Sequence, residues 1–558
     1  MTGGMRRSTR STRRADGWHN AQTVQLEGRE EAREVVVGEA LPSSAITARV
    51  DVSASSLRFV YPFTFDGGRM DELARGVEAA SVPGGERSLA VWERSEFPTD
   101  DLLAQVADFV APASGAPLTA ALWRMPEATL RSHRGVGGGS RHPGAVWTLR
   151  TRRGAVDFTF DSFELALFRH GVGFVVVGAT PASDAAAVWF TFLHFFRYIS
   201  GRRASPLTAV RQSGEPRSRS RSAFFPDLGG ICTVATAEHH TGEIVDALLA
   251  GAVPGSGRWW EEIFVPGMML PYAAAFIDGV APAGSAALLH RLRNFFHGDQ
   301  VIHPAGVDIA GPDPGLLPYA EQQWFVHSLN GGGFLACDAP ATPFFRSTLP
   351  GHIRNQYFLL FLLALEQRFF LMALSQQVSR RWVGRTESAE KQQVSVFTGI
   401  RDALLSFTAQ GFFAQTMQEE HHHRSYERWR EIFALNELYR EVSAEVREMH
   451  GQLELRERQR SVEAAHVQQR QSAALDRRLA FITWLLGLPV SLLLVVNASG
   501  NIALVRHILF GPVGVQPYDV FIGLGLEAIG IAVGLLAYTV LQRRTEQRAG
   551  SRDEGKWQ

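Results

Sequence analysis

Two long apolar runs near the C-terminal end dominate the hydrophobic pattern of the chain. Leu479 to Val496 is LAFITWLLGLPVSLLLVV and carries no charge, and Val520 to Leu541 is VFIGLGLEAIGIAVGLLAYTVL and carries one. A helix needs about 20 apolar residues to cross a bilayer, and lipid offers backbone groups no partner outside the helix. The pattern predicts a hairpin of two transmembrane helices over residues 477–541.

Basic residues next to the two runs predict the orientation of this hairpin. The flanking arginines are Arg470, Arg477, Arg478, Arg543, Arg544 and Arg548. The connection between the runs holds only Arg506. Because Lys and Arg next to membrane helices stay on the cytoplasmic side, we expect a multi-pass protein of the inner (plasma) membrane with both termini in the cytoplasm. Residues 542–558 then form a basic cytoplasmic tail.

A third apolar run begins at Tyr357 and continues as YFLLFLLALEQRFFLMAL. Glu366, Gln367 and Arg368 lie in its middle. Placing two charges and an amide in hydrocarbon costs several kcal/mol, so this run predicts a buried helix of the soluble part.

The stretch before the first transmembrane segment predicts one very long helix. Between Ser425 and Gln471 there is no proline, and Gly451 is the single glycine. Apolar residues recur there at steps of three and four: Leu435, Leu438, Val442, Val446, Met449 and Leu453. A helix from Ser425 to Val496 would be about 100 Å long at 1.5 Å per residue. We therefore expect residues 353–476 to form a helical region and a stalk that enters the membrane directly.

The remaining residues predict a mixed α/β domain behind a basic arm. Residues 1–43 carry many arginines without an apolar signal segment, which is typical of a disordered arm. Residues 44–352 alternate short apolar strands with helical patterns. The expected strands are 57–63, 88–92, 146–151, 155–160 and 171–178, the expected helices are 70–80 and 185–198, and 205–221 is expected to be a loop.

Composition excludes several classes of protein. The 558 residues hold 56 basic and 56 acidic side chains, a balance that gives no reason to expect nucleic acid as a partner. The two cysteines, Cys232 and Cys337, form no CxxC pair, so neither a zinc ribbon nor a disulfide scaffold is expected. No arrangement of Ser, His, Asp or paired carboxylates predicts an enzyme, and we expect no catalytic residues and no resident metal or cofactor.

This architecture resembles the CorA-type divalent-cation transporters. Several stretches are similar to divergent CorA-like proteins of bacteria: ELALFRHGVGFVVVG, QQWFVHSLNGGGFLACD, RNQYFLLFLLALEQRFFLMALSQQVS and YERWREIFALNELYREVSAEV. The resemblance covers residues 50–545. It implies a funnel-shaped homopentamer with an α/β cytosolic domain, a helical stalk and two C-terminal transmembrane helices. It also implies that the first membrane helix lines a pore for divalent cations such as magnesium, with a divalent cation as the transported or gating ion.

The chain departs from this family at the outer end of the first membrane segment. Such transporters carry a Gly-Met-Asn signature there, whereas this chain has Asn497-Ala498-Ser499-Gly500-Asn501. Gly500-Asn501 is a candidate to keep part of the role of this signature, with the amide oxygen of Asn497 or Asn501 facing a hydrated cation. The alternative is that Asn and Gly end a helix.

Two further sets of membrane residues are candidates for a pore. Thr483, Gly487 and Ser491 are spaced i, i+4 and i+8 and form a small, weakly polar stripe, which suits a pore lining or close helix packing. Glu527 is the one carboxylate within a predicted span. An intramembrane carboxylate faces protein or water, which makes Glu527 a candidate functional group, whereas its place near the outer boundary also allows contact with interfacial water.

Two other motifs favour structural interpretations. The run His421-His422-His423 puts its side chains in different directions on a helix, which indicates a solvated surface and not a metal site. The stretch 134–140, RGVGGGS, matches no phosphate-loop pattern and favours a hairpin connection.

Three functional hypotheses follow from the sequence. The first is a CorA-like cation channel or transporter gated through its cytosolic domain and stalk. The second is a ligand-gated membrane effector of a prokaryotic defence system, in which the cytosolic domain senses a small-molecule or nucleotide messenger and the membrane is permeabilised. The third is a membrane-anchored scaffold without a pore.

Overall fold

The computed structural model describes most of the chain. It covers residues 48–83, 88–133, 146–210, 240–263, 267–280, 284–298, 300, 315–381 and 387–511, with a few positions between 521 and 543. The chain divides into two compact units, residues 1–384 with 399–443, and residues 385–398 with 444–558. We call the first unit the head. The head contains the α/β domain together with helices that the sequence predicted as part of a separate helical region.

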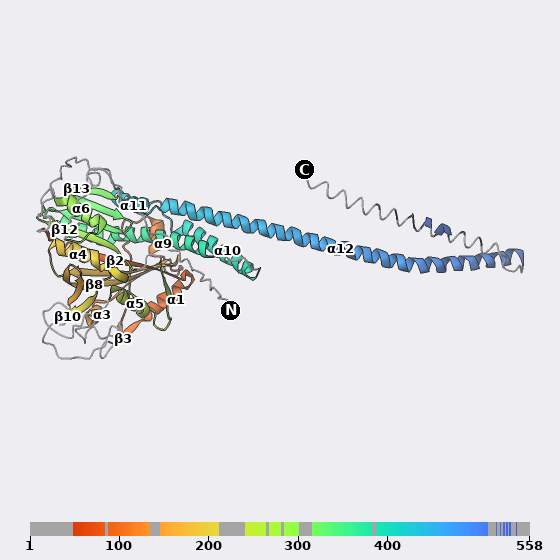
Figure 1. The fold of residues 1–558 in the computed structure, drawn as a ribbon, viewed down its shortest axis with the longest axis horizontal. Helices are drawn as coiled ribbons and strands as arrows, with labels where there is room; N and C mark the ends of the chain where they lie inside the picture. Colours follow the sequence, from red (N-terminus) through yellow and green to blue (C-terminus); the bar gives the residue numbers. More distant parts are fainter. Residues whose placement is uncertain are drawn as a thin grey trace, which may run out of the picture. The chain divides into compact units, whose positions relative to one another are not determined.

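A large mixed sheet forms the centre of the head (Figure 1). Its strand order is β10-β7-β8-β9-β2-β12-β15-β14-β13, with β1, β11, β6 and β5 attached at its sides. The pairs are antiparallel except β12 and β15, which run parallel. The strands are β1 (Arg49–Val50), β2 (Ser56–Phe65), β5 (Glu93–Ser95), β6 (Ala120–Arg124), β7 (Val146–Thr151), β8 (Gly154–Phe168), β9 (Val172–Pro181), β10 (Leu207–Val210), β11 (Trp260–Glu262), β12 (Leu270–Asp278), β13 (Leu316–Ala320), β14 (Gln323–Ser328) and β15 (Gly331–Cys337), and a separate pair is β3 (Ser81–Pro83) and β4 (Ser88–Ala90).

Helices connect and cover these strands. The α-helices are α1 (Met70–Ala79), α2 (Ala104–Val110), α3 (Glu127–His133), α4 (Ala186–Phe196), α5 (Thr241–Ala252), α6 (Ser285–Asn294), α8 (Leu349–His352), α9 (Phe358–Arg381), α10 (Glu387–Gln410), α11 (Glu420–Ile432) and α12 (Leu435–Phe510). Short 3-10 turns are η2 (Gly67–Arg69) and η3 (Gly201–Arg203), and π-helical turns are η5 (Phe344–Thr348) and η6 (Ile353–Tyr357).

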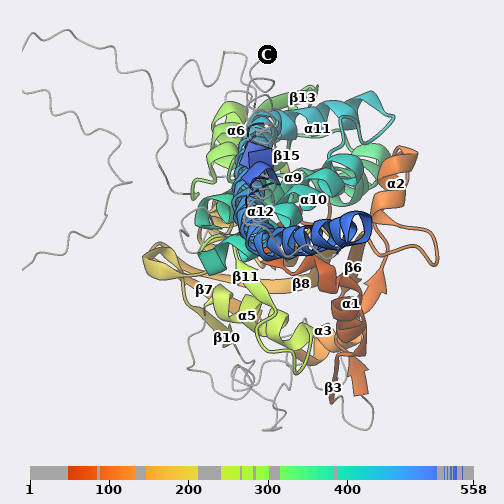
Figure 2. The same ribbon diagram turned by 90° about the vertical axis from the view of Figure 1, so that its right-hand side faces the viewer.

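Both faces of the sheet are buried, which explains the continuous apolar runs in the central strands. In β9, Val175 and Val177 belong to the core shared with α1, α4, α5 and α6. Phe174, on the opposite face of the same strand, lies 6.4 Å from Phe369 of α9, centroid to centroid. Figure 2 shows α9 and α11 on one side of the strands and α5 on the other.

Most expected elements of the head are confirmed. Strand β7 coincides with the expected range, and α1 and α4 differ from the expectation by one or two residues at their ends. Strand β8 is longer than expected because a register shift between Phe160 and Ser162 lets the chain stay paired with β9 up to Phe168. The expected loop at 205–221 is wrong at its start, where β10 pairs with β7.

The third apolar run is a buried helix, as expected. Residues Phe358–Leu365 are at most 3% exposed. Within the described part of the chain, the helix Phe344–Arg380 is long and apolar enough to cross a membrane, and 78% of its apolar window is buried inside the protein. This burial identifies it as a core helix of the head.

The expected single helix from Ser425 is wrong. Helix α11 ends at Ile432, and α12 begins at Leu435. Between them, Ala434 has a φ of 51°. This left-handed conformation does not occur within a right-handed helix. The burial of Phe433 stabilises this break, because its ring stacks on Trp429 at 5.1 Å and Arg368 covers it at 4.8 Å. The sequence offers no glycine or proline there to indicate a stop.

Candidate functional site

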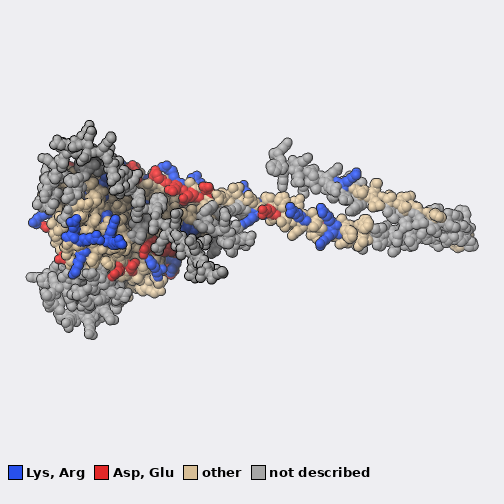
Figure 3. Space-filling view, viewed as in Figure 1, with Lys and Arg blue, Asp and Glu red and all other residues tan. Residues whose placement is uncertain are grey.

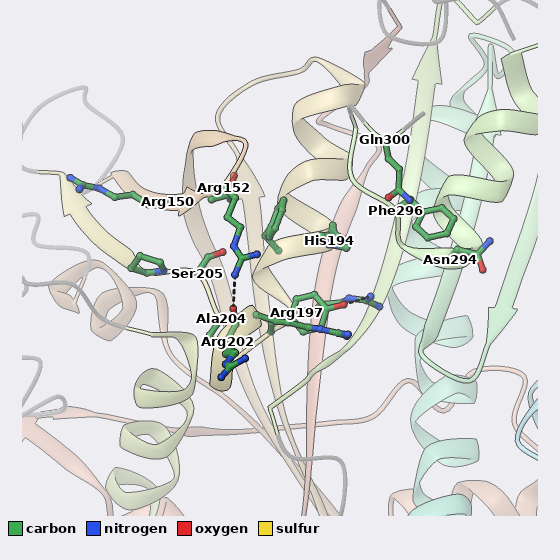
Figure 4. A pocket seen from close by; sticks show the side chains of 15 residues that line it. Arg150, Arg152, His194, Arg197, Arg202, Ala204, Ser205, Asn294, Phe296 and Gln300 are labelled. Atoms are coloured by element: carbon green, nitrogen blue, oxygen red, sulfur yellow. Dashed lines mark hydrogen bonds between the residues drawn. The ribbon is translucent and has the colours of Figure 1, made fainter. Parts of the chain in front are cut away.

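A cavity of about 680 Å³ lies in the head (Figure 4). The end of β7, the end of α4, η3 with the segment before β10, and the end of α6 contribute to its walls. This volume falls in the range of small-molecule sites. The lining residues are Arg150, Thr151, Arg152, His194, Phe195, Arg197, Tyr198, Arg202, Arg203, Ala204, Ser205, Pro206, Asn294, Phe296 and Gln300.

The packing of α4 fixes one wall of this cavity. Its apolar sequence buries Phe192 and Phe196 against the sheet, and Phe196 lies 4.7 Å from Phe59. Beyond the helix, the Arg197 carbonyl accepts from Met269 N at 2.8 Å, and Ile199 N donates to Gly267 O at 3.0 Å. The backbone that carries Arg197 is therefore held to the segment that leads into β12.

The end of α6 fixes the opposite wall. Phe295 adopts a left-handed conformation with a φ of 52°, and Phe296 N donates to Arg291 O at 3.0 Å, which caps the helix. The Arg291 guanidinium donates to His297 O at 2.9 Å and to Gln300 O at 3.2 Å. These bonds hold the segment that presents Phe296 and Gln300 to the cavity.

The cavity is strongly basic. Five arginines line it, and none of the described residues that line it is acidic. Within the described residues, Arg152, Arg197, Arg202 and Arg203 have no carboxylate partner, and Arg152 Nη2 donates instead to the Arg202 carbonyl at 3.3 Å. Figure 3 shows basic side chains gathered over α4 on the face of the head in view. Such a surface attracts anions.

Arg197 is the unusual member of this set. Its side chain is buried, at 6% exposed, and its Nη2 donates to the Tyr198 hydroxyl at 2.8 Å. Nε and Nη1 are also buried, and neither has a partner among the described residues. The guanidinium lies over the Tyr198 ring at 4.8 Å, and burial lowers its pKa. Arginine keeps its charge in proteins, so the three N–H groups of Nε and Nη1 beside a basic cavity have no acceptor among the described residues.

His194 adds an acceptor to the cavity. Its Nδ1 lies 2.6 Å from the Phe295 carbonyl, which can only accept, so Nδ1 carries the proton. Burial, together with the nearby charges of Arg197 and Arg203, lowers the pKa of His194. The ring is then neutral at pH 7, and its Nε2 is a hydrogen-bond acceptor.

The residues predicted as pore candidates lie elsewhere, on α12 in the second unit. Thr483, Gly487, Ser491, Asn497, Gly500 and Asn501 all fall within this helix. Thr483 Oγ1 donates to Leu479 O at 2.8 Å. A Cβ added at Gly487 would meet nothing within 4 Å. Glu527 lies outside the described residues.

The idea that Asn497 to Asn501 ends the first membrane helix is wrong. Helix α12 continues without interruption to Phe510, and Gly511 follows with a φ of 79°. A left-handed glycine directly after the last helical residue is a common helix stop. Asn497 and Asn501, four residues apart, therefore share one face of a helix. The beginning of the expected outer connection is helical as well.

The interpretation of the histidine run as a solvated surface needs correction. His422 is 2% exposed, and both of its ring nitrogens are buried without a partner among the described residues. Its ring packs on Tyr357 at 4.5 Å, and burial lowers its pKa to about 4. No group of His, Cys, Asp and Glu among the described residues is arranged to hold a metal ion. The stretch 134–140 lies outside the described residues.

The sequence prediction missed the basic cavity. A signal was present in two arginine clusters, Arg150 to Arg153 and Arg197 to Arg203, each following an apolar element. About fifty residues separate the clusters along the chain, and only the pairing of β10 with β7 brings them together. Comparison with known proteins adds no precedent, because no family model, no curated protein and no solved structure matches this chain.

Proposed function

We propose that this protein is a ligand-gated membrane channel whose head binds a phosphorylated small molecule. The observation that carries the proposal is Arg197, a buried guanidinium with two nitrogens that have no acceptor among the described residues, in a cavity lined by four more arginines. Phosphate oxygens are acceptors that match a guanidinium in geometry and charge. A phosphorylated ligand would supply what Arg197 lacks.

The membrane part of the proposal rests on the apolar segment of α12. Leu479, Phe481 and Ile482 are 58%, 61% and 48% exposed. Trp484 and Leu485 extend this exposed apolar surface. A continuous exposed apolar surface of this kind marks contact with a membrane or another protein. With the apolar sequence from Val520 to Leu541, it supports a two-helix transmembrane hairpin with both termini in the cytoplasm.

One helix connects the ligand-binding head with the proposed membrane segment. Helix α12 begins in the head, where Leu435 and Val442 are buried, and the same helix carries the apolar segment. A change in the head on ligand binding would act on the start of this helix. By resemblance to the CorA-type transporters, we expect five copies of α12 to surround the pore.

Ligand binding is tested with sodium tripolyphosphate and the detergent-solubilised full chain. We expect the ligand to raise the midpoint of thermal unfolding, since a ligand at 100 times its Kd stabilises by about 2.7 kcal/mol. Arg197→Met should abolish this shift. It should also leave the unliganded protein as stable as before, or more stable, because an apolar side chain replaces an unmatched charge.

Arg75→Ala is the matched control, since Arg75 is an exposed arginine of the head outside the cavity. The Arg75→Ala variant should keep the full rise in the midpoint of thermal unfolding on addition of tripolyphosphate. A tripolyphosphate shift that survives in Arg197→Met would contradict the proposed site.

Gating is tested by ion flux in proteoliposomes. We expect tripolyphosphate, ATP or GTP to raise flux in the unmodified protein and not in Arg197→Met. Thr483→Asp, on the face of the proposed pore, should change the rate of that flux without changing ligand binding. Flux equal to that of empty vesicles under every ligand, divalent ion and voltage would overturn the channel.

A selective cation transporter is the second candidate. The unbroken helix through Asn501 favours it, because Thr483, Gly487 and Ser491 then lie on one helical stripe, and Asn497 and Asn501 share a face further along the same helix. Growth rescue of a magnesium-transport-deficient strain would support selective transport. Ligand-dependent loss of membrane potential without rescue would support a membrane effector instead.

A further inference from the structure

The two sides of the basic cavity differ in chemistry. Figure 4 shows Arg150, Arg152, Arg202 and Ser205 on one side and Asn294, Phe296 and Gln300 on the other, with His194 and Arg197 between them. The charged groups of the first side only donate hydrogen bonds. The second side holds amides and an aromatic ring and no charged residue among those described.

The second side offers acceptors to a ligand. Asn294 Nδ2 donates one of its two N–H groups to His290 O at 3.0 Å, and its Oδ1 is an acceptor that it can offer. His194 Nε2 is a further acceptor, because Nδ1 is engaged with the Phe295 carbonyl. Acceptor atoms repel phosphate oxygens and attract N–H groups. This side is therefore suited to the part of a ligand that carries N–H donors.

Aromatic rings line the same side. Phe296 is half-buried and lies 5.8 Å from the His290 ring. Phe195 is half-buried and lies nearly parallel to His297, with 24° between the two ring planes. A flat aromatic group of a ligand stacks on such rings with a gain of about 1–3 kcal/mol.

We propose that the ligand is a nucleotide whose base carries an exocyclic amino group. Its phosphates lie against the arginines, with Arg197 as their buried partner. Its base lies between Phe296 and Asn294, with the amino group donating to Asn294 Oδ1 or His194 Nε2. This inference rests on the proposed anion site and adds the part of the ligand that inorganic phosphate lacks.

Matched nucleotide pairs test the proposal by calorimetric titration of the full chain in detergent. CTP carries a 4-amino group next to an unprotonated N3, where UTP carries a 4-oxo group next to N3–H, and ATP and ITP differ in the same way at C6 and N1. We expect ATP or CTP to bind at least tenfold more tightly than tripolyphosphate. We also expect the amino member of that pair to bind at least fivefold more tightly than its oxo partner.

Two variants separate the base from the phosphates. Asn294→Ala should reduce the preference for the amino base, and Phe296→Ala should weaken nucleotide binding about tenfold. Both should leave the affinity for tripolyphosphate unchanged. Asn330→Ala is the control, because Asn330 is an exposed asparagine outside the cavity.

The outcomes distinguish this inference from the proposed function. Equal affinity for tripolyphosphate and all four nucleotides, with no effect of Asn294→Ala or Phe296→Ala, would overturn the base site and leave the anion receptor intact. Absence of binding by every one of these probes would overturn both.

Discussion

Helix α9 and the apolar segment of α12 are alike in sequence and opposite in environment. Leu363 of α9 is 0% exposed, whereas Ile482 of α12 is 48% exposed. Helix α9 lies in the described helix that is long and apolar enough to cross a membrane, and Leu479 to Val496 is predicted to cross one from its sequence. Apolarity alone therefore does not separate a core helix of this protein from a predicted membrane helix.

The polar residues inside α9 explain the difference, because each has a partner in the head. Glu366 Oε1 lies 2.7 Å from His170 Nδ1, and Gln367 Nε2 donates to Gly411 O at 2.7 Å. Arg368 Nη1 donates to Leu329 O at 3.0 Å. These partners lie in the turn between β8 and β9, just after α10 and in the turn between β14 and β15. The apolar segment of α12 carries no charged or amide side chain from Leu479 to Val496.

The strongest test of this difference between α9 and the apolar segment of α12 is one charge placed in each helix. Leu363→Asp puts a carboxylate in a fully buried position, and we expect the head to lose at least about 4 kcal/mol of stability. Ile482→Asp should leave the unfolding of the head unchanged and reduce recovery in the membrane fraction, with an insertion penalty of about 3 kcal/mol. Protease resistance and membrane fractionation measure the two effects. Unfolding of the head in both variants would show that the two segments do not differ in environment.

The buried pair of His170 and Glu366 gives the next largest effect. Both side chains are nearly inaccessible, at 6% and 1% exposed. We expect His170→Ala to cost about 3 kcal/mol, since it leaves the carboxyl group of Glu366 buried without its partner. Chemical denaturation of the detergent-solubilised chain measures this loss.

Two further variants check the cause of that loss. His170→Ala with Glu366→Leu should recover most of it, because no polar group then stays unpaired. His423→Ala removes a more exposed pair with Glu427 at 3.3 Å and should cost under about 1 kcal/mol. Equal losses in His170→Ala and His423→Ala would contradict the role assigned to burial.

The sequence predicts local features of the head better than its long-range features. The short apolar run 146–151 predicts β7, the helical pattern over 70–80 predicts α1, and the polar trio of α9 predicts its burial. Both signals lie within one segment of the chain. The break at Ala434 is not predictable in this way, because the burial of Phe433 against Trp429 and Arg368 decides it, and α9 and α11 must first be packed together.

The basic cavity shows the same limit for function. Arg197 follows an apolar helix and looks like an ordinary basic cap at its C-terminal end. That its Nε and Nη1 are buried with no partner among the described residues becomes apparent only once Tyr198, Phe295 and the end of α6 are placed around it. The pore candidates Thr483, Gly487 and Ser491 are predicted from their spacing along one helix, and Asn497, Gly500 and Asn501 from their match to the place of the Gly-Met-Asn signature. All six lie on α12.

Acidification provides a smaller test of the head. The ring of His422 packs on Tyr357, the residue that directly precedes α9. Burial lowers the pKa of His422 to about 4. The unfolded chain, with a histidine pKa of about 6.5, binds more protons than the folded chain between these values. Stability should therefore fall as the pH falls from 6.5 towards 4, by about 2 kcal/mol per such histidine between pH 6.5 and 5.

His327 belongs to the same class, because burial lowers its pKa to about 3. His422→Phe should remove about half of the pH dependence that the two histidines cause together. His450→Gln is the control, since His450 of α12 is 47% exposed on its side chain, and it should change the pH dependence little. An unchanged pH dependence in His422→Phe would show that this ring is not the group that titrates.

The smallest effect concerns Ala434, where the helices of the head give way to α12. Its φ of 51° places a Cβ in the left-handed region, which costs an alanine about 1 kcal/mol. Ala434→Gly should therefore stabilise the protein by up to about 1 kcal/mol, because glycine adopts this conformation without the steric cost. Ala474→Gly, within α12, should destabilise that helix by about the same amount. Chemical denaturation and helical circular dichroism measure the effect of both variants on stability. Stabilisation by Ala434→Gly and destabilisation by Ala474→Gly would establish a real break between α11 and α12. Equal destabilisation would indicate that the helix is continuous through Ala434, as the sequence pattern first suggests.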